Sequence, residues 1–242
     1  MLIHVVKPGD TVYSIALEYG IPMSQLILDN GLETSSRLAV GQALVVQFPT
    51  QTHTVHPGET LASIAAAYQL PLRQLYRNNP ILGGIPEIYP GQTLVLAYDS
   101  TPEATLSVNG YAYPFIDPAL LQSTVPYLTY LTPFTYGFTP DGTLVELDDE
   151  ALLAAARQGG AAPLMHLSTL TEEGGFSNEL AHLALTQPAV QDTLVDNLEA
   201  MLVQKGYRGL DVDFEYVEER DKEAFFHFLG RARERLHQDG FF

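Results

Sequence analysis

The chain has 242 residues, 29 acidic against 12 basic side chains and a formal net charge of −17 at pH 7. This charge argues against nucleic acid and against an anionic membrane surface as partners, because phosphate binding needs clustered Lys and Arg. The chain contains no cysteine, so we expect neither a disulfide framework nor a thiolate metal site.

The amino-terminal segment reads as folded structure from its start. The Pro8-Gly9 turn comes before any hydrophobic segment of a signal peptide could form, and no run approaches the roughly 20 apolar residues that span a bilayer. We therefore expect no signal peptide, no membrane span, and a location in the cytoplasm of the producing cell or in association with a spore.

An internal repeat occupies the first hundred residues. The segment VKPGDT at 6–11 recurs as VHPGET at 55–60, and the correspondence continues to Gly41-Gln42 against Gly91-Gln92. Each copy predicts a strand, two helices and a strand, with Thr11 and Thr60 as helix N-caps. Pro22 and Pro71 suit the first turn of each second helix.

This repeat resembles the LysM module, with copies at residues 1–48 and 51–97. The resemblance implies binding of glycans that contain N-acetylglucosamine, in a groove between the loop after the first strand and the loop before the last. The residues that map to this groove are Gly9, Asp10, Thr11, Asn30, Gly58, Glu59, Thr60 and Asn79. The alternative is that they serve only turn and cap geometry.

A polar, proline-containing stretch at 98–103 predicts a linker, and strands alternate with helices from residue 104 to 242. We expect strands at 105–112, 127–138, 162–170 and 209–216, and helices at 117–122, 148–158, 177–205 (broken at Pro188) and 221–237. Such alternation predicts right-handed β-α-β units and a parallel sheet. Four units suit half of a (β/α)8 barrel or a small doubly wound sheet.

The chemistry is concentrated in the last of these strands. Asp211, Asp213 and Glu215 share one face of it because side chains alternate along a strand. Parallel strands normally read as continuous apolar runs, so three acids on one face are costly to bury unless protonated, paired or hydrogen-bonded. Neighbours on that face lie about 6–7 Å apart and titrate together. A shared proton there supplies the general acid that glycoside cleavage needs.

The segment resembles the signature of glycoside hydrolase family 18, Asp-Gly-x-Asp-x-Asp-x-Glu, at the end of the fourth barrel strand. The resemblance implies that Glu215 protonates the glycosidic oxygen. Asp213 would orient the acetamido group of the substrate, whose oxygen attacks the anomeric carbon, and Asp211 would hold Asp213. Arg208 departs from the first Asp of the signature, and alternation predicts that it points away from the three acids.

LysM repeats followed by such a domain resemble the spore-cortex-lytic N-acetylglucosaminidases. The implied function is cleavage of β-1,4 linkages next to N-acetylglucosamine in peptidoglycan, by substrate-assisted retaining catalysis. Tyr111, Tyr136 and Tyr216 are expected to bind substrate, although core packing explains Tyr111 and Tyr136 equally well. We expect His166 in the pocket wall or the core, and neither a metal ion nor a cofactor.

The predicted fold is therefore α+β in two βααβ modules and α/β in a (β/α)8 barrel. Such a barrel takes about 250 residues, and 104–242 holds 139 (242 − 104 + 1), so about the first four units are expected and the carboxylate strand becomes an exposed edge. The chain as a fragment of a longer enzyme, as a truncated product, or as one of two copies that complete a barrel are all open interpretations.

The alternative function is a non-catalytic peptidoglycan- or chitin-binding or spore-coat protein. Cortex, vegetative wall and chitin stay open as substrates, as does the oligomeric state.

Overall fold

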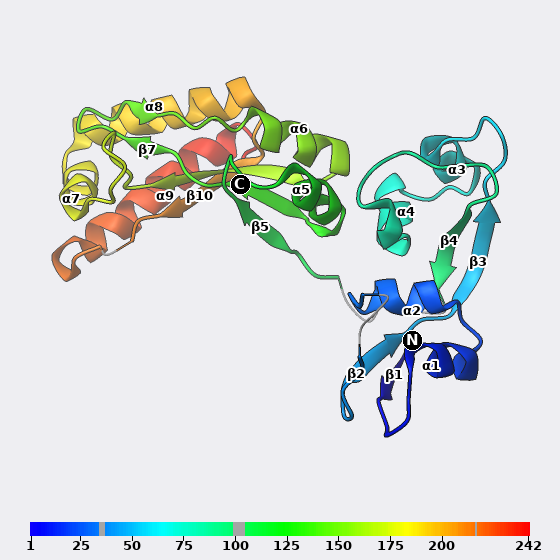
Figure 1. Ribbon diagram of the computed structural model, residues 1–242. Helices are drawn as coiled ribbons and strands as arrows, with labels where there is room; N and C mark the ends of the chain where they lie inside the picture. The colour runs from blue at the N-terminus through cyan, green and yellow to red at the C-terminus, as the bar shows by residue number, and fades with distance from the viewer. Residues whose placement is uncertain (34–36, 99–104, 216) are drawn as a thin grey trace. The chain divides into compact units, whose positions relative to one another are not determined.

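The computed structural model describes residues 1–33, 37–98, 105–215 and 217–242. These form two compact units, residues 1–106 with 122–127 and residues 107–121 with 128–242 (Figure 1). Most of the predicted linker, from 99 to 103, lies outside the described residues. Among the described helices, none combines the length and the apolar character that crossing a membrane requires.

The first repeat folds as the predicted strand, two helices and strand. The strands are β1 (Leu2–Val5) and β2 (Ala43–Val46), which pair antiparallel, and the helices are α1 (Val12–Tyr19) and α2 (Met23–Asp29). Thr11 caps α1 in a reciprocal capping box with Ser14. The buried core of the repeat consists of Val6, Ile15, Ala16, Ile21, Leu26, Leu44 and Val46.

The second repeat has the same order. It consists of β3 (Pro49–Thr54), α3 (Leu61–Ala67), α4 (Leu72–Asn78), the 3₁₀ turn η1 (Pro80–Leu82) and β4 (Thr93–Tyr98). Thr60 repeats the capping box of the first copy. Pro22 and Pro71 stand one position before the second helices, not within their first turns, because both have an extended ψ near 134°.

The second unit contains the predicted parallel sheet. Its strands are β5 (Asn109–Ala112), β6 (Tyr130–Pro133), β9 (Ala162–Ser168) and β10 (Gly209–Asp213), hydrogen-bonded in the order β10-β9-β6-β5. The predicted strand 127–138 is divided, since residues 137–138 form β7 (Gly137–Phe138), a hairpin with β8 (Leu144–Val145). The predicted strand 209–216 ends at Asp213.

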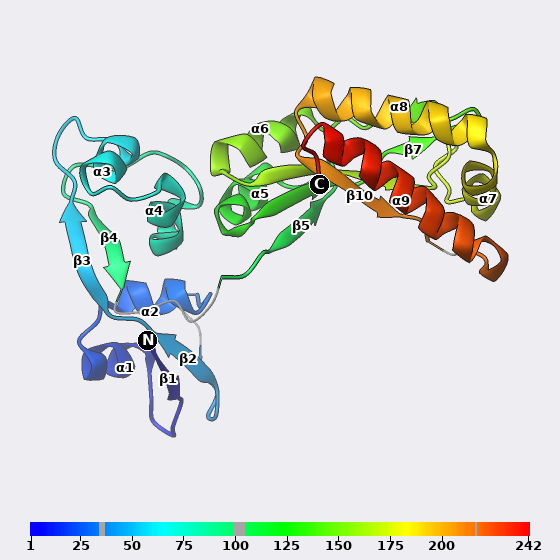
Figure 2. The ribbon, with the colours of Figure 1, turned by 180° about the vertical axis from the view of Figure 1, so that it is seen from behind.

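Helices alternate with these strands along the chain. They are α5 (Pro118–Thr124), α6 (Glu150–Gly159), α7 (Asn178–Thr186), α8 (Pro188–Lys205) and α9 (Lys222–Gln238), with 3₁₀ turns η2 (Val125–Tyr127) and η3 (Glu219–Asp221). The segment 122–127, at the end of α5 and in η2, groups with the first unit. The predicted break at Pro188 is confirmed, because Pro188 starts α8 after an extended Gln187. Helices α8 and α9 lie side by side in both views (Figures 1 and 2).

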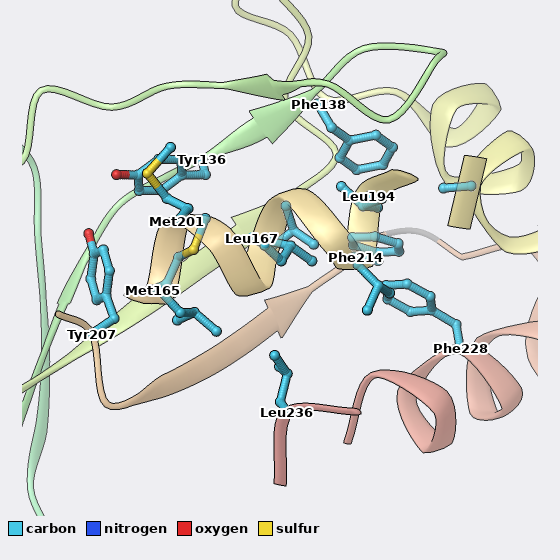
Figure 3. Packing of buried hydrophobic residues seen from close by; sticks show 14 of the residues in the cluster. Tyr136, Phe138, Met165, Leu167, Leu194, Met201, Tyr207, Phe214, Phe228 and Leu236 are labelled. Atoms are coloured by element: carbon cyan, nitrogen blue, oxygen red, sulfur yellow. The ribbon is translucent and has the colours of Figure 1, made fainter. Parts of the chain in front are cut away.

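The apolar side chains of the sheet and the helices meet in one core (Figure 3). Met165 and Leu167 of β9 point into it, as do Leu194 and Met201 of α8. Burying side chains of this size contributes roughly 1.5–3 kcal/mol each. This packing fixes one face of the sheet, so the polar residues of β9 and β10 are left on the opposite face.

The outer edge of β10 is partly paired by backbone from the same unit. Leu210 N donates to the carbonyl oxygen of Phe242 at 2.8 Å, and Phe242 N donates to that of Arg208 at 3.3 Å. A Cβ at position 209 would meet the Phe242 oxygen at 1.9 Å, so this approach requires Gly209. The edge that the sequence predicts to be exposed is therefore covered over its first residues.

Candidate active site

The carboxylate segment lies at the carboxyl end of the parallel sheet, where ligands of such sheets bind. Asp211 and Asp213 belong to β10, and their register places them beside His166 and Ser168 of β9. Glu215 lies two residues beyond the strand, exposed in a turn. Strand alternation therefore places the two aspartates on one face, as predicted, but does not by itself place Glu215.

The residue that anchors this turn is Phe214. Its side chain is 7% exposed and stacks on Phe138, Phe225 and Phe228 at centroid distances of 5.7, 5.8 and 5.6 Å. Aromatic stacking of this kind adds about 0.5–1.5 kcal/mol per pair beyond area burial. This packing fixes the backbone between Asp213 and Glu215.

Tyr111 of β5 reaches the first aspartate. Its hydroxyl donates to Asp211 Oδ2 at 2.7 Å. That hydrogen bond, with partial burial and the charges of Asp211 and Asp213, raises the pKa of Tyr111 to about 12. The phenol thus stays protonated at physiological pH and remains a donor. The prediction that Tyr111 lies at the site is consistent with this position.

His166 is the centre of the cluster. It is 1% exposed, its Nε2 lies 3.4 Å from Asp213 Oδ2, and its Nδ1 shares a 2.6 Å hydrogen bond with Thr135 Oγ1. Burial lowers the pKa of His166, while the charges of Asp211, Asp213 and Glu215 act in the opposite direction. All three predicted acids therefore act on this one imidazole.

Thr135 is a site residue that the sequence did not single out. Besides its bond with His166, it donates to Ser168 Oγ at 3.0 Å, and both residues are buried. Threonine in a strand-like run is ordinary, so no local pattern marked it. Its contacts make it a positioning residue for the imidazole.

An open hollow adjoins the aspartates. It is lined by Tyr111, Tyr113, Phe134, Asp211, Val212 and Asp213. Tyr113 stacks on Phe115 at 5.0 Å, and Phe134 packs on His166 at 4.7 Å. A few polar groups converging beside aromatic rings are typical of small-molecule sites, and here the polar groups are carboxylates.

Of the other tyrosines predicted to bind substrate, Tyr136 is a core residue. Its side chain is fully buried, and its hydroxyl donates to Asp149 Oδ2 at 2.5 Å. Asp149 also accepts from Tyr207 and forms an ion pair with Lys205 at 2.8 Å. Burial raises the pKa of Tyr136 to about 12. The prediction that Tyr136 lines the sugar pocket is therefore wrong, and Tyr216 lies outside the described residues.

In the repeats, the predicted groove residues around each first turn are largely occupied with local hydrogen bonds. Gly9 and Gly58 have φ near +90°, which favours glycine. Asp10 accepts from the backbone N–H of Lys7 and contacts His4, and these bonds hold the pKa of Asp10 below its usual range. Glu59 is held in the same way by His56 N–H and His53, which lowers its pKa. Thr11 and Thr60 serve as caps.

The two predicted groove asparagines are structural. The Asn79 amide donates to the carbonyl oxygens of Leu75 and Val95, and its Oδ1 accepts from Val95 N. Asn30 makes the equivalent three bonds, with Leu26 and Val45. Both donors of each amide are used and Asn79 is buried. Contrary to prediction, these side chains join the second helix to the last strand and have no donor left for a glycan.

Comparison with known proteins identifies the repeats. The LysM domain matches residues 4–47 and 53–97. The chain is 36% identical over 238 residues to the cortical fragment-lytic enzyme of Bacillus anthracis. The aligned region covers 96% of this chain and 54% of that enzyme. The chain spans about half the length of the curated relatives it matches.

Solved structures agree with this similarity. The crystal structure of the Bacillus cereus spore cortex-lytic enzyme SleL matches with a TM-score of 0.69 and 30% identity, covering 97% of this chain and 56% of that one. A class V chitinase of Pseudomonas fluorescens Pf-5 shares the fold over 56% of this chain and 43% of its own, with a TM-score of 0.50 and 24% identity. The chain thus carries two LysM domains and a chitinase-like α/β domain similar to that of spore cortex-lytic enzymes.

Proposed function

We propose that this protein binds peptidoglycan through its LysM domains and cleaves β-1,4 linkages next to N-acetylglucosamine with its second unit. The observation that carries the proposal is the grouping of Asp211, Asp213 and Glu215 about His166 at the carboxyl end of a parallel sheet. Glycoside cleavage uses a carboxylic acid to protonate the leaving oxygen, and Glu215 is the acid at the solvent side of the group.

The proposed mechanism is substrate-assisted and retaining. Glu215 gives its proton to the glycosidic oxygen as the bond to the anomeric carbon breaks, and the oxygen of the substrate's acetamido group forms a new bond to that carbon. Water then attacks the anomeric carbon: the water oxygen bonds to that carbon, the bond between the carbon and the acetamido oxygen breaks, and the Glu215 carboxylate takes a proton from the water. Asp213, beside His166 at 3.4 Å, orients the acetamido group, and Asp211, held by Tyr111 at 2.7 Å, supports Asp213.

The similarity to cortex-lytic enzymes of Bacillus supports spore-cortex peptidoglycan as the substrate and association with the spore as the location. We also propose that β5, β6, β9 and β10 correspond to the first four strands of a (β/α)8 barrel, within a domain from 104 to 242. Residues 1–48 and 51–97 would be the LysM modules, joined to it by the segment 98–103. A short linker keeps the second unit at high local concentration near the bound glycan.

The test is mass spectrometry of the products released from spore-cortex peptidoglycan. The full chain is compared with Glu215→Gln and with Glu219→Gln, a matched control whose side chain is 92% exposed on the neighbouring turn. New N-acetylglucosamine reducing ends are expected from the wild type and the control and not from Glu215→Gln. Equal release by all three chains would disprove the role of Glu215.

A second candidate is glycan binding without cleavage. The exposure of the acids favours this function. The Asp213 side chain is 45% exposed and Glu215 is exposed, whereas a general acid usually stays protonated because its surroundings are apolar. If no chain releases product while all sediment with peptidoglycan, the protein binds glycan without cleaving it. Loss of sedimentation as well would contradict both candidates.

A further inference from the structure

Two imidazoles and one carboxylate converge in the second LysM domain. His53 lies in β3, and His56 and Glu59 lie in the turn that follows. One ligand atom from each of the three side chains lies within 4.8 Å of the others. His53 Nε2 is 2.7 Å and His56 Nδ1 is 3.4 Å from Glu59 Oε2, and the two rings are 5.4 Å apart.

The first LysM domain provides an internal comparison. His4, Asp10 and Tyr19 repeat the contacts of His53, Glu59 and Tyr68: imidazole to carboxylate at 3.0 Å and imidazole to phenol at 3.0 Å, against 2.7 and 3.1 Å in the second domain. The histidine–acid–tyrosine set is therefore a shared part of this repeat. The difference is the second imidazole, because Lys7 stands where the second domain has His56.

From this difference we propose that His53, His56 and Glu59 form a site for a divalent transition-metal ion of the zinc type. Imidazole nitrogen and carboxylate oxygen are preferred zinc ligands, and three protein ligands with a water complete a tetrahedron. Metal–ligand bonds of about 2.0–2.2 Å place neighbouring ligand atoms about 3.3 Å apart. The His56–Glu59 distance of 3.4 Å already fits, and the His53–Glu59 distance of 2.7 Å has to lengthen by about 0.6 Å.

The surroundings suit metal entry and ligand orientation. His56 is 70% exposed and Glu59 30%, so an ion reaches the site from solvent, whereas His53 is 11% exposed and fixed. The Tyr68 hydroxyl lies 3.1 Å from His53 Nδ1. A phenol accepts as well as donates, so it can accept from Nδ1–H and leave the lone pair of Nε2 for the metal. Such outer partners orient metal-binding histidines.

Occupation of the site would link β3 to the turn that carries Glu59 and Thr60. This turn belongs to the predicted glycan groove, so the metal would restrain part of that surface. The first domain has Lys7 in place of the second imidazole, and lysine is not among the preferred zinc ligands, which confines the effect to the second domain.

The test is equilibrium dialysis of the full, chelator-treated chain against zinc chloride near neutral pH, with metal counted per chain. The wild type is expected to bind one zinc ion, His56→Lys none and Lys7→His two. Tyr68→Phe should weaken binding by about 10- to 100-fold, the usual effect of removing an outer partner. His56→Lys introduces the residue that the first domain carries at this position, so it preserves the fold, which circular dichroism checks.

Hydrogen exchange gives a second readout on the same samples. Zinc should slow exchange in the turn 55–60 of the wild type and leave the turn 6–11 unchanged, and Lys7→His should extend the protection to 6–11. The site is disproved if the wild type takes up no zinc, or if His56→Lys still binds one ion, since the ion would then lie elsewhere.

Discussion

Tyr111 donates a 2.7 Å hydrogen bond to Asp211, although the two residues stand on the outermost strands of the described four-stranded sheet. In a flat sheet these strands would be about 14 Å apart, three spacings of roughly 4.8 Å. Side chains standing upright on a flat sheet could not meet across that gap. The sheet is therefore curved toward the face that carries the carboxylates, as the proposed barrel requires.

This bond makes the ionisation of Tyr111 depend on Asp211. Asp211→Asn should lower the pKa of Tyr111 from about 12 toward the ordinary value of about 10. The Asp211 carboxylate accepts a hydrogen bond from the protonated phenol, and its negative charge destabilises the phenolate. Carbon-13 NMR of labelled tyrosines, assigned with Tyr111→Phe, measures the shift. An unchanged Tyr111 titration in Asp211→Asn would mean that the bond does not form in solution.

Two tyrosine variants should separate site from core. Tyr136→Phe removes a buried donor to Asp149 and should lower the free energy of unfolding by about 1–2 kcal/mol, with product release unchanged. Tyr111→Phe should have little effect on stability and slow release about tenfold or more, since it removes a bond to a charged site group. Urea unfolding and product release are measured on both variants. Slower release by Tyr136→Phe with unchanged stability would assign Tyr136 to the sugar pocket.

Stability should fall on mild acidification because of His166. Its folded-state pKa lies below the unfolded value of about 6.5, so the unfolded chain binds more protons between the two values. The stability contributed by the neutral imidazole is complete above about pH 6.5 and is lost as the pH falls toward the folded-state pKa. His166→Gln should flatten this part of the pH dependence of the urea midpoint. An identical slope in wild type and variant would assign the loss to other groups.

The asparagines of the LysM domains should behave as structural residues. Asn79→Ala leaves the Val95 N–H and two carbonyl oxygens without partners and should destabilise its domain by about 2–3 kcal/mol. Hydrogen exchange of the full chain should show faster exchange in residues 51–97 and not in 4–47. Asn30→Ala should give the mirror-image result. Weaker glycan binding with unchanged exchange would instead assign Asn79 to the groove.

Two glycines of the second unit should respond oppositely to alanine. A Cβ at Gly137 would lie 2.0 Å from the carbonyl oxygen of Leu170, so Gly137→Ala should destabilise by about 1–3 kcal/mol through overpacking. Gly230 lies in α9 with open space around its Cβ position, and Gly230→Ala should stabilise by about 0.5–1 kcal/mol. Thermal unfolding measures the stability of both variants. Equal changes in stability would show that the backbone moves enough to relieve the contact at Gly137.

Much of the fold could be predicted because its signals are local. The Thr11 and Thr60 caps, the break at Pro188 and the alternation of strands and helices follow from neighbouring residues, and each is confirmed. The hairpin of β7 and β8 was missed because a run rich in Thr, Tyr and Phe reads as one strand. Its signal was the Pro140-Asp141-Gly142 turn, in which Gly142 has φ of +86°.

The sequence by itself determined the two repeats, the alternating unit and the spacing of the three acids, because caps, turns and periodicity act over a few residues. Only the tertiary structure decided which groups surround those acids. Tyr111 comes from a strand 100 positions away from Asp211, and no local pattern specifies such pairing. Burial likewise decided that Tyr136 and Asn79 are structural, since a polar side chain serves whichever partners the folded chain places within hydrogen-bonding distance.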